Sequence, residues 1–126
     1  KNVIRRSGEN ISALEVEAAL SEDPAIAMAV VCPVPDDIRG DEVIACVIPA
    51  PGAATDAIAA EEITRRALES LVYFKVPGYV GFYEGLPLTP SEKPTRAEIK
   101  ALARSSLDNG ECYDVRQLKK RQASST

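Results

Sequence analysis

The sequence contains no histidine, and this absence excludes several kinds of chemistry within the chain. Ser-His and Cys-His nucleophilic catalysis both need an imidazole base, and histidine is also the commonest metal ligand. The seven glycines are scattered, so neither common type of glycine-rich phosphate-binding loop is present. If a nucleotide is handled here, most of the binding apparatus must lie elsewhere.

The signs of membrane-bound, secreted and nucleic-acid-binding proteins are missing as well. No apolar run approaches the roughly 20 residues of a membrane-spanning helix, and no signal peptide opens the chain. The formal net charge is −4, so no overall positive field favours nucleic acid. The three cysteines, Cys32, Cys46 and Cys112, are widely spaced and form no metal-type pair. This pattern predicts a reduced, cytoplasmic protein without a metal site, in which Cys32 and Cys46 are small core residues of strands.

Length and composition indicate one globular domain of ordinary type. The 126 residues are 45% hydrophobic and 27% charged, which supplies enough apolar material for a core. The first residue is Lys1 rather than methionine, which favours a segment of a longer polypeptide.

Apolar patterning and capping signals predict a small α+β domain. Ser12 and Glu15 have the spacing of a capping box, which opens a helix that ends before Pro24. Two apolar runs separated by a polar turn indicate a buried antiparallel strand pair. The predicted order is βαββαβα, with a short N-terminal hairpin and a central, roughly three-stranded antiparallel sheet packed by helices. The predicted elements are a hairpin over residues 2–11, helices over 12–20, 60–73 and 95–104, and strands over 25–34, 42–49 and 79–83.

The end of the chain has no clear periodicity and is rich in charge. The last fifteen residues contain one aspartate against four lysines or arginines, a local charge of +3. Residues 105–126 are therefore predicted to be a polar, partly basic and flexible tail. The alternative is a tail that makes contacts specific to this protein.

A proline-braced loop with one lysine near its tip is the most informative segment. It runs from Leu86 to Thr95, and prolines at positions 87, 90 and 94 each fix φ and disfavour helix at the preceding residue. The loop is therefore predicted to be extended and exposed, with Lys93 as a mobile positive charge. Taken alone, Lys93 is most simply a solvated surface lysine. A mobile cation would also suit a reaction that develops negative charge on phosphoryl and carboxylate oxygens.

Four collinear motifs together carry a family resemblance. They are residues 1–17, KNVIRRSGENISALEVE; residues 30–45, VVCPVPDDIRGDEVIA; Tyr73–Pro77; and Leu86–Lys93. In this order they resemble the hinge and following loop, the central strand pair and the two later motifs of one family. That family is the C-terminal domain of adenylate-forming enzymes, above all acyl-CoA synthetases. The resemblance covers residues 1 to about 104.

The resemblance implies that the chain is the C-terminal lid of a longer enzyme, with residues 1–11 as its hinge and hairpin loop. In that family a large N-terminal domain binds ATP and the carboxylic acid and mainly holds the Mg. The small domain closes over it in one orientation for acyl-adenylate formation and in another for transfer to coenzyme A. The expected partners are thus the N-terminal domain of the same polypeptide and a carboxylic acid. The isolated chain is expected to fold but to be inactive.

The resemblance also assigns roles to individual residues. Lys93 matches the catalytic lysine, which touches the carboxylate and the α-phosphate during adenylate formation. Gly8 matches the glycine of the loop that lines the pantetheine tunnel. Arg5 and Asn10 match positions used in thioester formation, and Lys1 matches the hinge.

Simpler explanations stay open for several of these residues. Gly8 is also what a tight hairpin turn requires, and Arg5 and Asn10 are also ordinary surface residues. Lys75 is more simply a solvated lysine that complements a helix dipole than a ligand contact.

Two positions depart from the family pattern. Glu92 stands where glycine usually precedes the catalytic lysine, which removes a flexible position and adds a negative charge. Gly78 stands where arginine is common, which removes one candidate contact to coenzyme A phosphates.

Two other functions are compatible with the same motifs. The first is the adenylation-domain lid of a peptide synthetase, although no carrier-type Gly-Gly-x-Ser motif follows the last helix. The second is a non-catalytic binding module with the same fold, which the presence of Lys93 and Gly8 disfavours. The acid that is activated is not readable from this chain, because its pocket belongs to the N-terminal domain.

Overall fold

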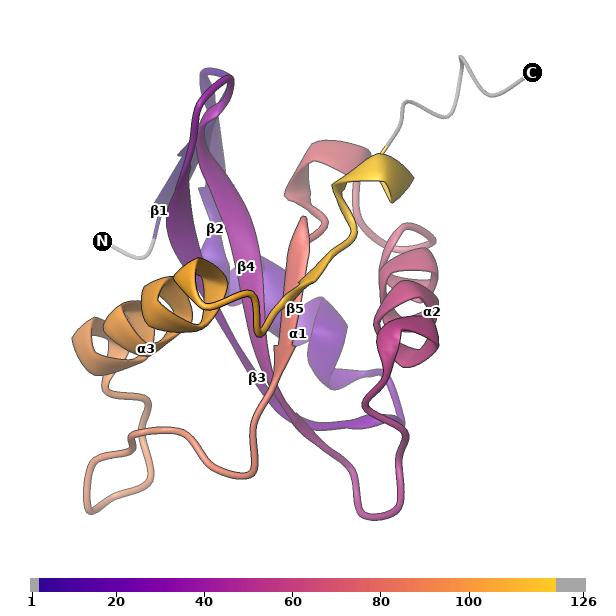
Figure 1. Ribbon diagram of the computed structural model, residues 1–126, viewed down its shortest axis with the longest axis vertical. Coiled ribbons are helices and arrows are strands. Elements are labelled where there is room, and N and C mark those ends of the chain that lie inside the picture. Colours follow the sequence, from indigo (N-terminus) through magenta and orange to yellow (C-terminus); the bar gives the residue numbers. More distant parts are fainter. Residues whose placement is uncertain (1–2, 120–126) are drawn as a thin grey trace.

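A six-stranded mixed sheet forms the centre of the computed structural model, which describes residues 3–119 (Figure 1). Strand β4 lies in the middle of the sheet, because it pairs with β3 along its whole length and with both β1 and β5. The strands are β1 (Val3–Arg6), β2 (Glu9–Ser12), β3 (Ile26–Asp36), β4 (Gly40–Pro49), β5 (Tyr79–Phe82) and β6 (Tyr113–Asp114).

Helices connect these strands, and those that follow Ser12 and Asp56 begin at side-chain caps, whereas the helix that follows Thr95 has no side-chain cap. Ser12 Oγ accepts a hydrogen bond from Glu15 N at 3.3 Å, as the capping signal predicted, and Asp56 Oδ1 accepts one from Ala59 N at 2.9 Å. None of the helices within residues 3–119 is long and apolar enough to cross a membrane. The helices are α1 (Ala13–Ser21), α2 (Ala57–Ala67) and α3 (Arg96–Asp108), with 3-10 turns η1 (Tyr73–Lys75) and η2 (Arg116–Leu118).

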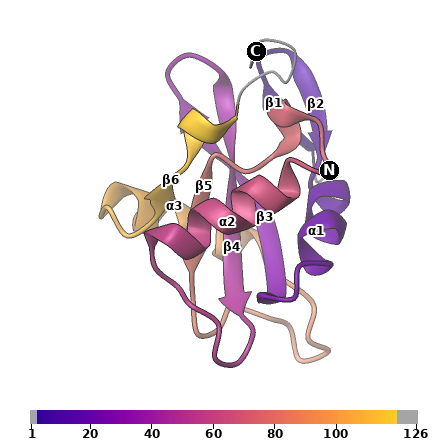
Figure 2. The same cartoon turned by 90° about the vertical axis from the view of Figure 1, so that its right-hand side faces the viewer.

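Both faces of the sheet are covered, so β3 and β4 bury side chains in two directions (Figures 1 and 2). Helices α1 and α2 pack on one face, over residues such as Val31 and Ala45. Helix α3 packs on the other face, where Cys32 and Cys46 are buried as predicted. Because neither face meets solvent, these strands are apolar without alternation, which explains the continuous hydrophobic runs of the sequence.

The structure confirms the α+β class but corrects the description of the sheet. The predicted sheet was antiparallel and roughly three-stranded, whereas β5 runs parallel to β4, with Ile44 opposite Tyr79. The cause is the connection, since α2 crosses over the sheet between β4 and β5 and a crossover returns the chain in the same direction. The hairpin also joins this sheet, through Arg6 opposite Gly40, and β6 adds a further strand.

The prediction of a flexible tail needs correction over residues 105–119. Helix α3 continues to Asp108, and β6 pairs with β5 so that Tyr113 lies opposite Val80. Val115 is only 3% exposed, and Lys119 is buried as well. Two contacts hold this stretch in place: β6 pairs with the edge of β5, and Lys119 binds the buried carboxylate of Glu42. Neither contact produces a periodic pattern in the sequence. Residues 120–126 lie outside the described residues.

Candidate functional site

The loop that carries Lys93 is a closed, exposed turn between β5 and α3. Thr89 N donates to Lys93 O at 2.8 Å, Glu92 N donates to Thr89 O at 2.8 Å, and Lys93 N donates to Thr89 Oγ1 at 3.1 Å. The Lys93 side chain is exposed, and its ammonium forms no hydrogen bond or ion pair with any residue of the range 3–119. The backbone of this lysine is thus fixed, while its charge is available to an external partner.

The C-terminal stem of this loop is anchored to the core. Thr95 N donates to Pro87 O at 3.0 Å and closes the base of the loop. The next residue, Arg96, donates two hydrogen bonds to Glu17 of α1, at 2.8 and 2.9 Å. Glu17 also accepts a bond from Val31 N at 2.8 Å, and its carboxylate raises the pKa of Arg96 above the usual range. The lysine therefore projects from a rigid base.

Glu92 adopts an unusual backbone conformation for a residue with a side chain. Its φ is 65°, in the left-handed region that glycine occupies without steric cost. Its carboxylate forms no ion pair with Lys93 in the described structure. The position thus keeps the backbone shape that a glycine would give the loop, at some cost in strain.

The hairpin at the other candidate site turns in two residues. Arg6 pairs with Glu9, which leaves Ser7 and Gly8 at the tip with φ values of 51° and 83°. Two successive positive φ values are typical of a type I′ turn, and they account for glycine here on structural grounds alone. A Cβ atom added to Gly8 would have no other atom within 4 Å, so the turn is open to an external partner.

The hairpin places Arg5 and Asn10 directly opposite each other on its exposed face. Side chains of such cross-strand pairs are neighbours, with Cβ atoms about 4.5–5.5 Å apart. Ile4 and Arg6 point to the buried side instead. The structure therefore brings together two of the residues predicted for thioester formation, next to the turn that contains Gly8. Lys1, predicted as the hinge, lies outside the described residues.

The two candidate parts lie at opposite ends of the domain. In both views the turn between β1 and β2 is at the top, beside the turn between β3 and β4, and the loop before α3 is at the bottom (Figures 1 and 2). The sheet and α1 separate them. A partner that meets Lys93 therefore does not meet Gly8 unless the domain turns.

The departure from the family pattern at Gly78 has a structural cause. A Cβ atom at this position would lie 2.6 Å from Glu42 Cδ and 2.9 Å from Arg116 Cγ. These side chains occupy the space that an arginine at position 78 would need. Lys75, which was predicted to be a solvated surface lysine, forms an ion pair with Glu15, with 3.0 Å between Nζ and Oε1. Position 78 thus supplies no cation, and the ammonium of Lys75 is already paired with a carboxylate.

A buried cluster of charges, here called the Glu42 cluster, consists of Arg6, Glu42 and Lys119 and was missed by sequence reasoning. Glu42 Oε1 accepts from Arg6 Nε at 3.1 Å, and Glu42 Oε2 accepts from Lys119 Nζ at 2.6 Å. Burial lowers the pKa of Lys119 to about 8, although Glu42 opposes this change. One feature of the sequence did indicate a buried charge here, because Glu42 directly precedes the apolar run of β4.

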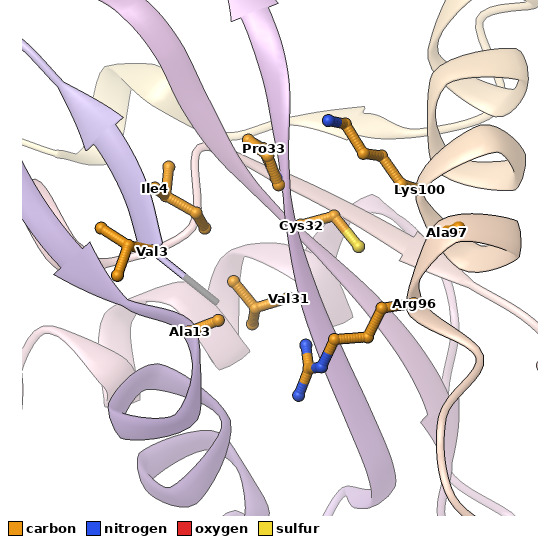
Figure 3. Close-up of a pocket in the computed structure, with 9 residues that line it drawn as sticks. All are labelled: Val3, Ile4, Ala13, Val31, Cys32, Pro33, Arg96, Ala97 and Lys100. Atoms are coloured by element: carbon orange, nitrogen blue, oxygen red, sulfur yellow. The ribbon is translucent and has the colours of Figure 1, made fainter. Parts of the chain in front are cut away.

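A cavity of about 230 Å³ opens between β1, β3 and α3 (Figure 3). Its walls are mainly apolar, and its polar members are Cys32, Arg96 and Lys100. Arg96 is already bound by Glu17, and burial raises the pKa of the Cys32 thiol to about 11, which keeps it protonated. Lys93, Gly8, Arg5 and Asn10 do not line this cavity. It is therefore not the place where the predicted site residues act.

Metal-ligating side chains of the described residues form no cluster that could hold an ion. No group of three or more histidine, cysteine, aspartate or glutamate residues within the range 3–119 is placed to hold a metal ion. The domain offers one exposed cation at one end and an open turn flanked by an arginine at the other. Such a set can complete a site that another domain provides.

Comparison with known proteins matches residues 15–93 to the model of the AMP-binding enzyme C-terminal domain. A probable CoA ligase of Humulus lupulus is 40% identical over 96 residues, which are 76% of this chain and 18% of that protein. An acyl-CoA synthetase structure from Brucella canis is 35% identical with a TM-score of 0.77, and the match covers 87% of this chain and 20% of that one. The o-succinylbenzoate CoA synthetase of Bacillus subtilis, solved with an acyl-adenylate intermediate, is 30% identical with a TM-score of 0.70, over 79% and 19% of the two chains.

The fold and the matched residues identify the class of domain to which the chain belongs. The chain belongs to the family of AMP-binding enzyme C-terminal domains, which confirms the resemblance seen in the sequence. It spans about a fifth of the length of the relatives named above. These relatives are named as CoA ligases or synthetases, and none as a peptide synthetase.

Proposed function

We propose that this chain is the mobile C-terminal domain of a cytoplasmic, ATP-dependent and AMP-forming acyl-CoA synthetase. Lys93 serves acyl-adenylate formation, and the Ser7–Gly8 turn, with Arg5 and Asn10, serves thioester formation. The observation that carries the proposal is the separation of these two parts, which lie at opposite ends of one sheet (Figures 1 and 2). One domain that must present both ends to one active site has to rotate between two half-reactions.

Lys93 is suited to adenylate formation by its geometry and its charge. As a carboxylate oxygen attacks the α-phosphorus of ATP and the bond to the departing pyrophosphate breaks, negative charge accumulates on the non-bridging oxygens. A cation carried on a rigid loop stabilises this charge without proton transfer, provided that domain closure brings it within contact distance. The ammonium of Lys93 has no partner in the described part of the domain that would compete with the substrate.

The hairpin is suited to the second half-reaction because its tip is narrow and open. The turn at Gly8 presents backbone without a side chain, so a pantetheine arm can lie close to it. Arg5 and Asn10 stand next to each other on the exposed face of the same hairpin and supply a positive charge and an amide. These groups bind and orient coenzyme A and do not need to transfer a proton.

The remaining components belong to the N-terminal domain of the longer polypeptide. That domain would bind ATP and the carboxylic acid and would hold a magnesium ion, which would supply further positive charge for the phosphoryl oxygens. The residues of this chain complete its site by closure. The acyl group is selected in the N-terminal domain, so it is not specified by Lys93 or by the hairpin.

The test is the rate of acyl-adenylate formation by the full-length enzyme and its Lys93→Ala variant. We expect this rate to fall about 10²–10³-fold, which is typical for loss of a charge that stabilises a transition state. Lys100→Ala is the matched control, because Lys100 is also an exposed lysine and lies on α3. An unchanged rate in Lys93→Ala, or an equal loss in both variants, would contradict the proposal.

A further inference from the structure

We propose that Lys119 and Glu42 are positioning residues for the coenzyme A half-reaction, because they hold the arginine on which the Ser7–Gly8 turn is mounted. This inference rests on the proposed function and extends it to residues outside the hairpin. Neither side chain can touch a substrate directly, since the side chains of Lys119 and Glu42 are 0% and 1% exposed. Any effect on the reaction must therefore pass through the groups that they bind.

Glu42 joins three parts of the chain that are far apart in the sequence. Its carboxylate accepts from Arg6, 36 positions away, and from Lys119, 77 positions away. It also accepts a hydrogen bond from Val43 N at 2.8 Å. With three donors on two oxygens, this buried carboxylate is well satisfied, and loss of either cation would leave it short of a partner.

Arg6 transmits this arrangement to the turn. It is the last residue of β1 and directly precedes Ser7, whose backbone N donates to Arg39 O at 2.8 Å. The turn is thus held by the backbone on one side and by the Arg6 side chain on the other. A two-residue turn buries little surface of its own, so its orientation depends on these attachments.

Lys119 also contacts the other wall of the hollow beside the turn. Its Nζ donates to Phe74 O of η1 at 3.4 Å. A hollow of about 470 Å³ next to the turn is lined by Arg6 and Ser7 on one side and by Tyr73 and Phe74 on the other, together with Glu9 and Arg39. One buried ammonium therefore fixes both walls, one directly and one through Glu42.

The cluster is remote from the other candidate part. No hydrogen bond or ion pair within residues 3–119 joins Arg6, Glu42 or Lys119 to the loop 86–95. That loop lies at the opposite end of the domain (Figures 1 and 2). A role in positioning thus predicts a selective effect on one half-reaction, whereas a role in stability alone predicts no such selection.

The experiment uses the full-length enzyme with Lys119→Met, which keeps the length of the side chain and removes its charge. Adenylate formation should stay within about two-fold of wild type, and transfer from a supplied acyl-adenylate to coenzyme A should fall about 10-fold or more. Hydrogen exchange at the amide of Ser7 should become faster, while exchange over residues 86–95 stays unchanged. Arg66→Gln is the control, because it removes another ion pair, to Asp23 at 2.8 Å.

A double-mutant cycle separates positioning from general destabilisation. Because Lys119 and Glu42 act through one contact, the loss of transfer activity in Lys119→Met/Glu42→Gln should be smaller than the product of the two single losses. Lys119→Met leaves the buried carboxylate of Glu42 paired with Arg6, whereas Glu42→Gln and the double variant leave the Arg6 guanidinium without a carboxylate, so Lys119→Met is the variant expected to fold best.

Three results would overturn the inference: equal loss of both half-reactions, unchanged transfer to coenzyme A, or failure of Lys119→Met to fold. These results would leave the proposed function intact if Lys93→Ala still abolishes adenylate formation. If the wild-type enzyme forms no acyl-adenylate at all, the proposed function fails first, and the two failures are distinguishable.

Discussion

At the scale of single residues, Glu92 is the position where one substitution should improve the domain. Its φ of 65° costs a residue with a Cβ atom about 1–2 kcal/mol, and glycine avoids most of this strain. After the larger unfolded-state entropy of glycine is subtracted, Glu92→Gly should stabilise the domain by about 0.5–1 kcal/mol. Urea unfolding measures this difference.

The neighbouring Ser91 provides the control for this prediction. Its φ is not positive, so Ser91→Gly adds chain entropy without relieving strain and should destabilise the domain. A Glu92→Gly variant that is no more stable than wild type would mean that the left-handed conformation carries no cost in this loop.

Lys119 should make stability depend on pH in a direction that is uncommon for a lysine. Burial is the main cause that lowers its pKa to about 8, with Arg6 and Arg39 in the same direction and Glu42 against them. In the unfolded chain a lysine titrates near about 10.4. Between these values the unfolded chain binds more protons, so the contribution of this group to the free energy of unfolding rises with pH. It is fully present above the unfolded pKa and is lost as pH falls through about 8.

Comparison of wild type with Lys119→Met isolates this contribution, because other titrating groups are common to both proteins. Urea unfolding at about pH 7.5 and about pH 10 should show that wild type gains stability relative to the variant at the higher pH. A difference that is constant between the two pH values, or that shrinks, would contradict the assignment of a lowered pKa to Lys119.

At the scale of elements, the strand and turn after α3 are part of the folded domain, and this makes a prediction about Val115. Its side chain is 3% exposed, so Val115→Ala should lower the free energy of unfolding by about 2 kcal/mol through lost burial and a residual cavity. Val72→Ala is the matched control, since Val72 is 47% exposed and should cost much less. Equal and small effects would support the flexible tail that the sequence suggested.

The elements that the sequence predicted well are those whose signal is local. Ser12 and Glu15 predicted the start of α1. The apolar runs of β3 and β4 are long enough to indicate strands without knowledge of the strands that pair with them. Strand β6 was missed because two residues have no periodicity. The parallel pairing of β5 was missed because direction depends on the path of the chain through α2.

The candidate site also contains residues that the sequence could predict and contacts that it could not. Lys93, Gly8, Arg5 and Asn10 were identified from a family resemblance, and the pairing of Arg5 with Asn10 follows from a two-residue turn. The contacts of Glu42 were not predictable, because its partners are 36 and 77 positions away and only the fold brings them together. For the same reason Lys119 was predicted to be one of the solvated charges of a flexible tail.

At the scale of the whole molecule, one sheet joins two ends of the domain that differ in their exposed groups. A sheet buried on both faces holds the Lys93 loop through Arg96 and holds the hairpin through the Glu42 cluster. In the proposed function, rotation of the domain exchanges one end for the other at the active site. We therefore expect that a substitution at one end leaves the half-reaction of the other end intact.

The hairpin end is tested by two substitutions at Gly8. Gly8→Leu places a bulky side chain at the open turn and should block transfer to coenzyme A, with adenylate accumulating. Leucine at a φ of 83° also costs about 1–2 kcal/mol of strain, so Gly8→Asn is the control that tolerates positive φ with a smaller side chain. Loss of both half-reactions in Gly8→Leu would mean that Gly8 is structural.

The proposed division of labour between the two ends is tested by measuring both half-reactions in one preparation each of Lys93→Ala and Gly8→Leu, in the full-length enzyme. We expect a crossed pattern, in which Lys93→Ala fails to form acyl-adenylate but transfers a supplied acyl-adenylate to coenzyme A, and Gly8→Leu does the reverse. A Lys93→Ala enzyme that a supplied acyl-adenylate cannot rescue, together with a Gly8→Leu enzyme that loses both steps, would contradict it.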